Sequence, residues 1–497
     1  RTDGAPAGVA GVSASVDEPQ FTTAIGRIRD YIRAGDTYQV NYTYRLRFDA
    51  YGTPFSLYAR LRRRQPVPYG ALIALPDGGA VLSLSPELFV RHSAGELVTR
   101  PMKGTAPASG DPADDAQRAA ELAADPKNRA ENLMIVDLLR NDLGRVCETG
   151  SVRVPKLFEV TRFGSVLQMT STVSGRLRAS CTLGDIFAAI YPCGSITGAP
   201  KRRTMEIIAE VETAPRGIYT GAIGWFDPPA APGSVGDFCL SVPIRTLALS
   251  APANGVRRGV LGVGAGIVYD SEPASEYAEC RLKARFLTGM QPEFGLFETI
   301  HAEAGACRHA DRHLDRMGAS AAYFGIPFDR AHATALLGAE CAGNPSPARV
   351  RLALAADGAL GVQSSPLAPL AQPVRILVAA QPVRSDELFA RHKTTVRARY
   401  DAAWRDAEAQ GAFDTVFFNE KGELAEGGRS SVFVKVGGRW CTPPLTSGVL
   451  PGVMRAAILQ DPAWDAVERV VTRAQFDAAT DIMVCNALRG ALPARRG

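Results

Sequence analysis

Apolar residues recur at intervals of three and four along several stretches of the chain, which is the spacing of an amphipathic helix. Phe21, Ile25, Ile28 and Ile32 follow this spacing and stop before a turn at 34–36. They predict a helix from residue 21 to that turn. The same spacing predicts helices over about 128–144, 184–190, 201–212, 274–286, 311–324 and 396–409.

Short apolar runs bounded by Gly, Pro and Asp predict strands. Residues 69–75 and 80–84 are separated by Pro-Asp-Gly-Gly, which predicts a hairpin. A second hairpin is predicted over 349–363, around Asp357-Gly358. Further strands are predicted at 88–90, 166–175, 218–226, 237–249, 258–269, 374–380, 414–418 and 431–436, and a loop at 106–117.

The pattern divides the chain into two different folds. Residues 1–20 are rich in Gly, Ala, Pro and Ser, and we expect them to be loose. The pattern restarts around 288–295, so the predicted domains are 21–288 and 291–497. Strands and helices occur in both domains, and the predicted fold class is α/β in the broad α+β sense.

Composition narrows the class of protein. The chain has 497 residues, 46% hydrophobic and 22% charged, which excludes a largely disordered or collagenous protein. Its apolar runs are shorter than the roughly 20 residues of a membrane span. A net charge of +5 with scattered Arg gives no nucleic-acid footprint. The chain begins with Arg1, so we expect a fragment or a processed form.

Cysteine and histidine usage limits the metal chemistry. Nine Cys without CxxC spacing predict reduced thiols in a cytoplasmic protein. His92 is the single His among the first 290 residues, which argues against a His-based zinc site in that half. Any metal there would be a hard cation bound by carboxylates.

The first half contains a group of carboxylates suited to such a cation. Glu276, Glu279 and Lys283 share one face of the predicted helix over 274–286. The two carboxylates, together with one from another helix such as Glu131, could hold Mg²⁺. Spacing alone favours a solvated set of charge pairs over a metal site.

Two glycine-rich segments could bind anions through main-chain N–H groups. Gly194-Ser-Ile-Thr-Gly-Ala-Pro-Lys201 enters a helix, and Gly262-Val-Gly-Ala-Gly266 follows a strand. Taken alone, each segment favours a structural turn. Together with Arg245 and Lys283 they would suit a substrate with two carboxylates.

These motifs resemble the chorismate-utilising family, in its aminodeoxychorismate synthase branch, over residues 20–288. The resemblance rests on Tyr38-Gln-Val-Asn41, Ser85-Pro-Glu87, Pro101-Met-Lys-Gly-Thr105, Glu131 to Asp142, Gly194 to Lys201, Arg216 to Gly221, Gly264-Ala-Gly266 and Glu276 to Lys283. It implies a sandwich of antiparallel sheets flanked by helices, with chorismate as substrate and Mg²⁺ as cofactor.

The resemblance also implies roles for individual residues. Glu131 and Glu279 would ligate Mg²⁺ with Glu276 beside them, and Glu87 would be the general acid that protonates the leaving 4-hydroxyl. The implied substrate-binding residues are Gln39, Thr197, Tyr219, Arg245, Gly264 and Lys283.

Two positions indicate the branch of the family. Lys103 stands where anthranilate synthases have a small residue, and it would attack C2 of chorismate as a neutral amine. Gln39 stands where isochorismate and salicylate synthases use a lysine to activate water. Both favour an amine as the incoming group. No glutaminase sequence is visible, so ammonia would be free or come from a separate glutamine amidotransferase subunit.

The second half contains residue types that suit pyridoxal phosphate. Lys393, Glu426 and Arg316 provide an amine, a carboxylate for a ring nitrogen and a cation for a phosphate. Without further support each would be read as a surface charge. Their order resembles the fold-type IV pyridoxal-phosphate family, in its aminodeoxychorismate lyase branch, over about 294–490.

That resemblance makes Lys393 the residue that attaches to the cofactor and moves the proton. Glu426 would pair with the ring nitrogen, Arg316 and the backbone at Gly452–Met454 would hold the phosphate, and Thr299 would contact substrate. Ser431 and Met454 depart from the family pattern, since many relatives have Asn and a hydroxyl residue there.

The sequence therefore predicts a fused enzyme that makes 4-amino-4-deoxychorismate and then eliminates pyruvate to give 4-aminobenzoate for folate. Three alternatives stay open. The second half could be an aminotransferase or a non-catalytic scaffold, the first half could be an anthranilate synthase, or the chain could only dock a glutaminase.

Overall fold

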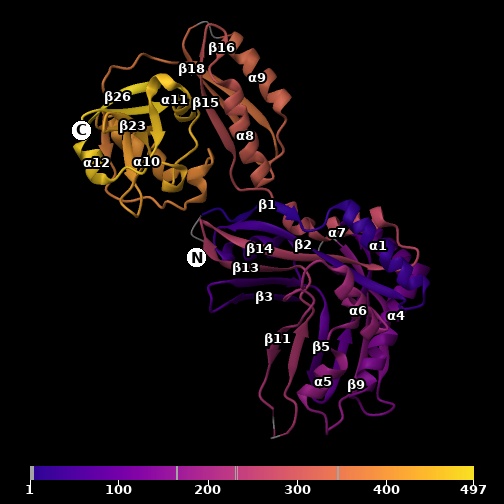
Figure 1. The fold of residues 1–497 in the computed structure, drawn as a ribbon. Coiled ribbons are helices and arrows are strands. Elements are labelled where there is room, and N and C mark those ends of the chain that lie inside the picture. Colours follow the sequence, from indigo (N-terminus) through magenta and orange to yellow (C-terminus); the bar gives the residue numbers. More distant parts are fainter. Residues whose placement is uncertain (1–4, 164–165, 230, 232, 344–345) are drawn as a thin grey trace.

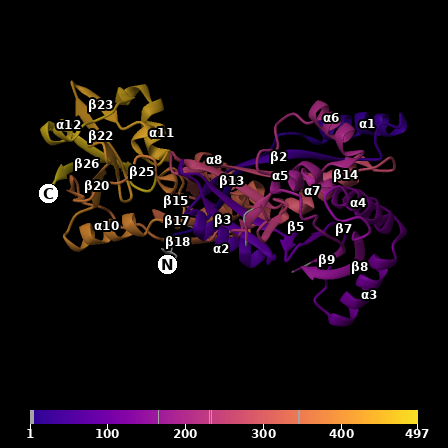
Figure 2. The ribbon, with the colours of Figure 1, turned by 90° about the horizontal axis from the view of Figure 1, so that it is seen from below.

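The computed structural model describes residues 5–163, 166–229, 231, 233–343 and 346–497. An N-terminal half ends with helix α7 (Pro273–Thr288), and a C-terminal half begins with strand β15 (Leu296–Glu303). The halves meet where α8 (Ala310–Phe324) of the second packs against β1 (Gly8–Ala14) of the first (Figure 1, Figure 2).

The N-terminal half contains two seven-stranded antiparallel sheets. The first has the order β1-β2-β14-β13-β4-β3, with β10 also paired to β2. The strands are β2 (Gln39–Tyr51), β3 (Tyr69–Ala74), β4 (Ala80–Ser85), β10 (Gly198–Ala199), β13 (Thr246–Ala253) and β14 (Val256–Ile267). Strand β14 pairs with β2 from Ile267 opposite Val40 to Arg257 opposite Ala50. The glycines of β14 therefore lie beside the start of β2.

The second sheet has the order β11-β12-β5-β6-β9-β7, with β8 also paired to β9. Its strands are β5 (Leu88–Ser93), β6 (Glu96–Arg100), β7 (Met102–Pro107), β8 (Arg153–Phe163), β9 (Val166–Arg176), β11 (Ile223–Phe226) and β12 (Phe238–Ser241). Residues 86 and 87 connect β4 of the first sheet to β5 of the second. A residue in that connection is therefore placed where the two sheets meet.

Helices cover both sheets of this half. They are α1 (Glu18–Arg33), α2 (Pro54–Arg64), α3 (Pro112–Ala124), α4 (Pro126–Gly144), α5 (Leu183–Ile190), α6 (Lys201–Val211) and α7. Helix α1 starts at a capping box, in which Asp17 accepts from the Gln20 N–H at 2.8 Å. Its apolar face, with Phe21, Ile25 and Ile28, is fully buried in the core under the first sheet.

The C-terminal half has two further sheets. Strands β15, β16 (Ala306–Cys307), β17 (Ala348–Leu354) and β18 (Leu360–Pro366) form the first, in the order β16-β15-β17-β18, against α8 and α9 (Arg330–Ala342). The second has the order β21-β20-β19-β26-β25-β22-β23-β24. Its strands are β19 (Val374–Val378), β20 (Asp414–Phe418), β21 (Leu424–Gly427), β22 (Ser431–Val436), β23 (Arg439–Thr442), β24 (Ala466–Glu468), β25 (Ile482–Asn486) and β26 (Gly490–Arg496).

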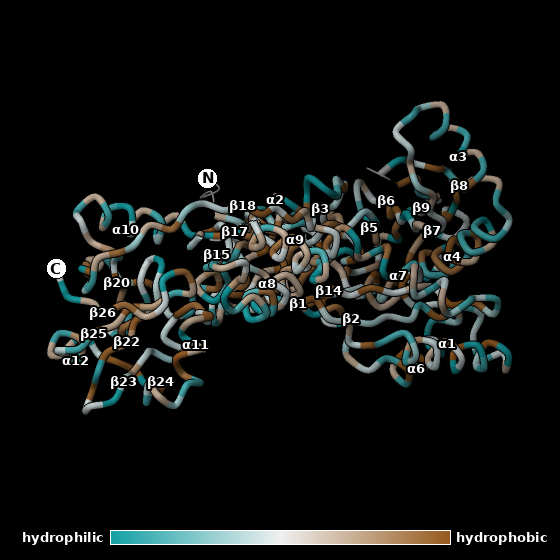
Figure 3. Tube along the Cα trace, turned by 90° about the horizontal axis from the view of Figure 1, so that it is seen from above, coloured by the Kyte–Doolittle hydropathy of each residue, from teal (hydrophilic) through white to brown (hydrophobic). Residues whose placement is uncertain are grey.

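Helices α10 (Ala398–Ala409), α11 (Val453–Gln460) and α12 (Arg473–Ala478) accompany this second sheet. The described ranges also contain four short 3₁₀ turns, Gly194–Ile196, Leu388–Arg391, Leu445–Ser447 and Pro462–Trp464. Hydrophobic positions concentrate along the middle of the molecule, around α8, α9 and β14 (Figure 3). In the described part of the chain, no helix combines the length and apolar character needed to cross a membrane.

The predicted helices and both predicted hairpins are confirmed. Two predicted strands are wrong in extent: the run 237–249 forms β12 and β13, which lie in different sheets, and only Ile223–Phe226 of the run 218–226 is a strand. Two further segment predictions are wrong. Residues 1–20 are not all loose, because β1 pairs with β2 from Gly8 opposite Tyr51 to Ala14 opposite Leu46. Strand β1 consists mostly of small residues with weak strand preference, so its pattern gave no signal. The predicted loop at 106–117 contains the start of α3, where Asp111 caps the helix and Pro112 occupies its first position.

The prediction of nine reduced thiols is also wrong for one pair. Cys307 of β16 and Cys341 of α9 form a disulfide, 34 residues apart in sequence. The other seven cysteines are free thiols. A spacing of this length matches no motif, so only the packing of α9 against β16 reveals the pair.

Candidate active sites

Glu87 lies in the connection between β4 and β5, and it is 4% exposed. The Ser195 hydroxyl donates to its Oε1 at 2.7 Å. Burial raises the pKa of Glu87 to about 7, and the Ser195 hydroxyl and the charge of Lys103 only partly oppose this. A glutamate in this state is half protonated at neutral pH, as a general acid must be.

Lys103 lies on β7 and is half-buried. Burial lowers the pKa of its amine; Glu131 and Glu279 oppose this shift, and Lys283 adds to it. These charges belong to α4 and α7, so Lys103 lies within electrostatic reach of both helices and of Glu87. The site therefore contains an amine biased toward its neutral form and an acid biased toward its protonated form.

Gln39, at the start of β2, is fully buried beside Lys103. A Cβ on Gly266 would lie 2.6 Å from the Lys103 Nζ and 2.8 Å from the Gln39 Nε2, so both groups occupy the space left by that glycine. Among the described residues, neither polar atom of the Gln39 amide has a hydrogen-bond partner. A buried amide with unused donor and acceptor groups is suited to bind a ligand.

The segment from Gly194 to Lys201 crosses the start of β2. Gly198 has a φ of +148° and pairs with Val40, and a Cβ there would collide with the main chain of Gln39. The Thr197 hydroxyl donates to the Cys193 carbonyl at 3.1 Å, so it stabilises its own loop. The Asn41 N–H donates to the Thr197 carbonyl at 2.7 Å. This segment therefore fixes both Gln39 and the Ser195 hydroxyl.

The predicted carboxylate-binding residues differ in whether their hydrogen-bond donors are free or already in use. Arg245 has a φ of +51°, and its buried Nη1 lacks a hydrogen-bond partner in the described structure. Burial lowers its pKa. The Tyr219 ring packs on Gly262, and burial raises the pKa of its phenol. The Lys283 Nζ donates to the Gly264 carbonyl at 2.9 Å.

The three predicted metal ligands do not assemble into a metal site. Glu276 accepts from Ser271 at 2.7 Å, and Glu279 pairs with Lys283 at 2.7 Å. Burial raises the pKa of Glu276; burial also acts to raise that of Glu279, but Lys283 outweighs it and leaves the pKa lowered. Within the described ranges, no group of three His, Cys, Asp or Glu side chains is arranged to hold a metal ion. The assignment of these glutamates to Mg²⁺ therefore stays a prediction, and a cation there would have to compete with Lys283 for Glu279.

Sequence reasoning missed the buried carboxylate of Glu212, which follows α6. It accepts from Arg216 at 2.6 Å and from the N–H and hydroxyl of Thr43 at 2.9 and 2.8 Å. Arg216 in turn donates to the carbonyls of Ile196 and Asn41, both at 2.7 Å. The pair ties the glycine-rich loop to β2. Nothing in the spacing around Glu212 distinguished it from a surface residue.

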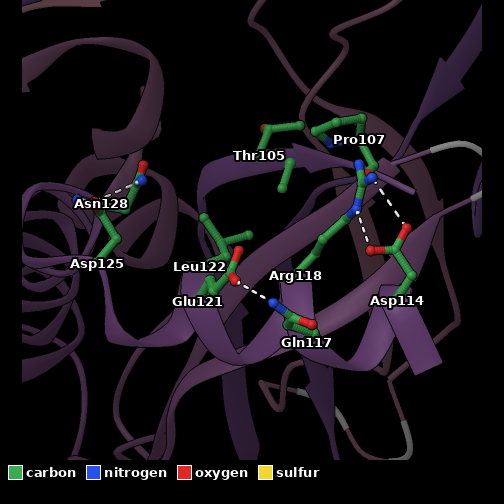
Figure 4. Close-up of a pocket in the computed structure, with 10 residues that line it drawn as sticks. Thr105, Pro107, Asp114, Gln117, Arg118, Glu121, Leu122, Asp125 and Asn128 are labelled. Carbon is green, nitrogen blue, oxygen red and sulfur yellow. Dashed lines mark hydrogen bonds and ion pairs between the residues drawn. The ribbon is translucent and has the colours of Figure 1, made fainter. Parts of the chain in front are cut away.

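A cleft of about 560 Å³ lies beside the strand of Lys103, between β7, α3 and the start of α4 (Figure 4). Its polar groups bond to one another: Arg118 to Asp114 at 3.0 Å and Gln117 to Glu121 at 2.9 Å. It is lined by Thr105, Ala106, Pro107, Asp114, Gln117, Arg118, Glu121, Leu122, Asp125 and Asn128. None of the predicted site residues is among them.

In the second half, Lys393 is half-buried, with its Nζ 4.8 Å from the centre of the Phe297 ring. Burial lowers the pKa of Lys393 to about 7, and Arg316 and Arg397 add to this effect. Glu298 and Glu426 oppose it. A substantial fraction of this amine is therefore neutral at pH 7, as a Schiff-base lysine requires.

Glu426, on β21, is buried and accepts from the Leu450 N–H at 2.9 Å. Burial raises the pKa of Glu426 to about 7, with opposition from that N–H, Arg397 and Lys393. The second half therefore combines a lysine of lowered pKa with a glutamate of raised pKa, as Lys103 and Glu87 do in the first half.

Arg316 lies on α8 beside a carboxylate that sequence reasoning missed. Its Nε and Nη2 donate to the two oxygens of Glu298 at 2.9 and 2.5 Å, and its Nη1 donates to the Pro451 carbonyl at 3.0 Å. His313 bonds to the same carboxylate at 2.7 Å. Glu298 lies within Phe-Glu-Thr and His313 three residues before Arg316, so the motifs contained a usable signal.

The other two predicted residues of this half occupy different surroundings. Gly452 directly precedes α11, and a Cβ there would lie 2.7 Å from the Ser431 hydroxyl. Thr299 lies on β15 opposite Arg351 of β17. The structure thus brings Lys393 into electrostatic reach of Glu426 and Arg316, and Arg316 to the segment before Gly452. That donor set fits the groups of pyridoxal phosphate.

Residues 2–289 match the family model described as chorismate binding enzyme, and residues 295–496 match that described as amino-transferase class IV. The chain is 44% identical over 268 residues to aminodeoxychorismate synthase component 1 of Klebsiella aerogenes, covering 54% of this chain and 56% of the relative. It is 42% identical over 278 residues to anthranilate synthase component 1 of Streptomyces coelicolor, covering 56% and 52%.

Among solved structures, anthranilate synthase component I from Streptococcus pneumoniae is 36% identical, with a TM-score of 0.50, covering 57% of this chain and 60% of that one. The chain spans about half the length of the curated relatives it matches. The predicted resemblance and mixed fold class are confirmed. The chain belongs to the chorismate binding enzyme family, and a class IV amino-transferase-like domain follows in the same chain.

Proposed function

We propose that the first half makes 4-amino-4-deoxychorismate from chorismate and ammonia, and that the second half eliminates pyruvate to give 4-aminobenzoate for folate biosynthesis. The observation that carries the proposal is the pairing of Lys103, an amine biased toward neutrality, with Glu87, an acid with a pKa of about 7. An anthranilate synthase needs no lysine nucleophile at this position, so Lys103 favours amination at C4.

The first reaction divides between these two residues. Neutral Lys103 attacks C2 of chorismate, the ring double bonds shift, and the C4–O bond breaks as Glu87 donates a proton, so that water leaves. Ammonia then attacks C4 and expels the Lys103 amine, and the ammonium proton returns to Glu87. The net reaction consumes chorismate and ammonia and releases aminodeoxychorismate and water.

Substrate binding would use groups that have no hydrogen-bond partner among the described residues. The unpartnered amide of Gln39 and the Nη1 of Arg245 are available to ligand oxygens. Lys283, Tyr219 and the backbone at Gly264 and Thr197 would complete the binding of the two carboxylates. Ammonia would come from a separate glutamine amidotransferase subunit. That partner and a cytoplasmic location stay predictions.

The second half would hold pyridoxal phosphate through Lys393, Glu426, Arg316 and the backbone at Gly452. When bound, that cofactor supplies an electron sink for the elimination. Lys393, with a pKa of about 7, would remove the substrate's α-proton. Glu426 would hold a proton at the ring nitrogen, and Arg316 would bind the phosphate. Thr299 would contact substrate.

Product analysis separates the alternatives. With chorismate, ammonium and Mg²⁺, the purified chain should form aminodeoxychorismate and 4-aminobenzoate, measured by liquid chromatography with mass detection. Lys103→Ala should lower 4-amination at least about 10³-fold, because the attacking group is lost. Surface Lys156→Ala serves as the control and should retain activity. Release of 2-aminobenzoate would identify an anthranilate synthase instead.

The pH profile of the first reaction tests the role of Glu87. The alkaline limb of kcat/KM should lie near pH 7, where Glu87 loses its proton. The Ser195 hydroxyl stabilises ionised Glu87, so Ser195→Ala should raise its pKa and move that limb upward by about one pH unit. Ser83→Ala removes another buried hydroxyl, bonded to Thr246, and should leave the limb in place. An unmoved or lowered limb in Ser195→Ala would contradict the assignment.

Magnesium is proposed for the first site from the family resemblance alone. A cation would have to displace Lys283 from Glu279. If it does, EDTA should abolish aminodeoxychorismate formation, and Mg²⁺ should restore it. Glu131→Gln and Glu279→Gln should lower activity at low Mg²⁺ and recover partly at high Mg²⁺, because each removes one negative ligand. Full activity in EDTA would remove the metal from the proposal.

Cofactor attachment tests the second half. Borohydride treatment of the chain with pyridoxal phosphate should fix the cofactor to the peptide that contains Lys393. Lys393→Ala should let aminodeoxychorismate accumulate while 4-aminobenzoate release falls at least about 10³-fold. The exposed Lys421→Ala is the control. If the unaltered chain takes up no cofactor and releases no 4-aminobenzoate, the second half is a scaffold.

A further inference from the structure

Strand β2 joins the first site to the second half of the chain. Gln39 at its start lies beside Lys103, whereas Asp49 and Tyr51 at its end touch residues of the second half. The Tyr51 ring packs edge-on against Phe324 and Phe389, with centroids 5.9 and 5.7 Å apart. Tyr51 therefore belongs to the same hydrophobic core as α8 and the small sheet of the second half.

Asp49 supplies a polar contact in this boundary. Its Oδ2 accepts from the Tyr323 hydroxyl of α8 at 2.9 Å, and its Oδ1 accepts from Arg258 at 2.6 Å. Arg258 is 80% exposed, while the Asp49 side chain is 12% exposed. The exposed Arg258 side chain leaves its own contact open to solvent, whereas the Tyr323 hydroxyl reaches Asp49 from α8 of the second half.

Tyr323 also contacts His392, the residue before Lys393. The two rings stack nearly parallel, with centroids 5.0 Å apart and an angle of 8°. Ser320, one turn earlier on α8, bonds to the His392 Nδ1 at 3.0 Å. Burial lowers the pKa of His392 to about 4, so the ring is neutral and packs as an aromatic group. His392 is therefore held by α8 on two sides.

His392 directly precedes Lys393, so its position sets the main chain of that lysine. The Thr394 N–H donates to the His392 carbonyl at 3.0 Å, and the Phe297 N–H donates to the Lys393 carbonyl at 3.1 Å. The segment is thus fixed to β15 on one side and, through His392, to α8 on the other. A lysine that must reach one carbon atom needs its main chain held to within about 0.5 Å.

We propose that Asp49 of the first half is a positioning residue for the second site, acting through Tyr323 and His392 on Lys393. The inference rests on the proposed role of Lys393. It implies that the second half takes part of its active-site support from the chorismate-binding half, so the fusion of the two halves is functional. A contact that only holds the two halves together would stabilise the chain, and its loss would not change the reactivity of the Lys393 amine.

The test reads the Lys393 amine directly, in the full chain and without cofactor. Trace acetic anhydride labels neutral amines, and mass spectrometry of peptides gives the labelling of each lysine as a function of pH. Around Lys393 the charged groups are Arg316, Arg397, Glu298 and Glu426. None of them is altered. The variants are Asp49→Ala, Asp49→Asn and, as a matched control, Glu293→Gln, which breaks the ion pair with Arg60 near the same boundary.

We expect Asp49→Ala to lower Lys393 labelling at pH 7 at least about tenfold, because a displaced lysine gains solvent and its pKa rises by about one unit or more toward the ordinary value. Labelling of Lys103 should not change. Asp49→Asn should keep Lys393 labelling close to that of the unaltered chain, since the Asn amide oxygen can still accept from Tyr323. Glu293→Gln should behave as the unaltered chain.

Unchanged Lys393 labelling in Asp49→Ala would overturn the inference, as would an equal fall at Lys103 and Lys393. If Asp49→Ala does not fold, Tyr323→Phe makes the same test by removing one oxygen, and unchanged labelling there is equally decisive. Failure of the unaltered chain to take up pyridoxal phosphate would refute the proposed function instead, because the labelling requires no cofactor.

Discussion

Desolvation of ionisable side chains is the constraint on which both sites depend. Each half places a lysine and a glutamate within electrostatic reach of each other, and burial penalises the charged form of both. A tight ion pair would reverse these shifts, as Arg316 and His313 do for Glu298, whose pKa they hold well below its ordinary value despite its burial. Among the described residues the reactive groups form no such tight ion pair, and the pKa values of Glu87, Lys393 and Glu426 lie near 7.

The main chain of β2 supports much of this arrangement. Its first residues are fixed by the loop from Gly194 to Lys201 and by the Glu212–Arg216 pair. Its neighbour β14 has glycine where Lys103 and Gln39 need room. Its last residues enter the core of the second half. One strand therefore links the substrate-binding groups of the first site to the boundary with the second.

Much of the fold could be predicted from sequence, because helices such as α1 and α8 have a clear apolar face. Strand β1 and helix α3 could not, since small residues and alanine give little periodic contrast. Lys103, Glu87, Lys393 and Glu426 were found through motifs, but their pKa values depend on burial, which no motif reports. Glu212, Glu298 and His313 were missed because their partners are distant or their roles supporting. The pairing of Glu279 with Lys283 could not be predicted, because helix spacing does not say which neighbour pairs with each carboxylate.

The most direct test is a ¹³C NMR titration of the glutamate side-chain carboxyls in the full chain, with Glu87→Gln and Glu426→Gln to assign the two signals. Burial without a tight ion pair predicts that both carboxyls titrate near pH 7. Titration of either near the ordinary glutamate value of about 4.3 would show that water or an ion pair offsets the burial, and would contradict the central claim.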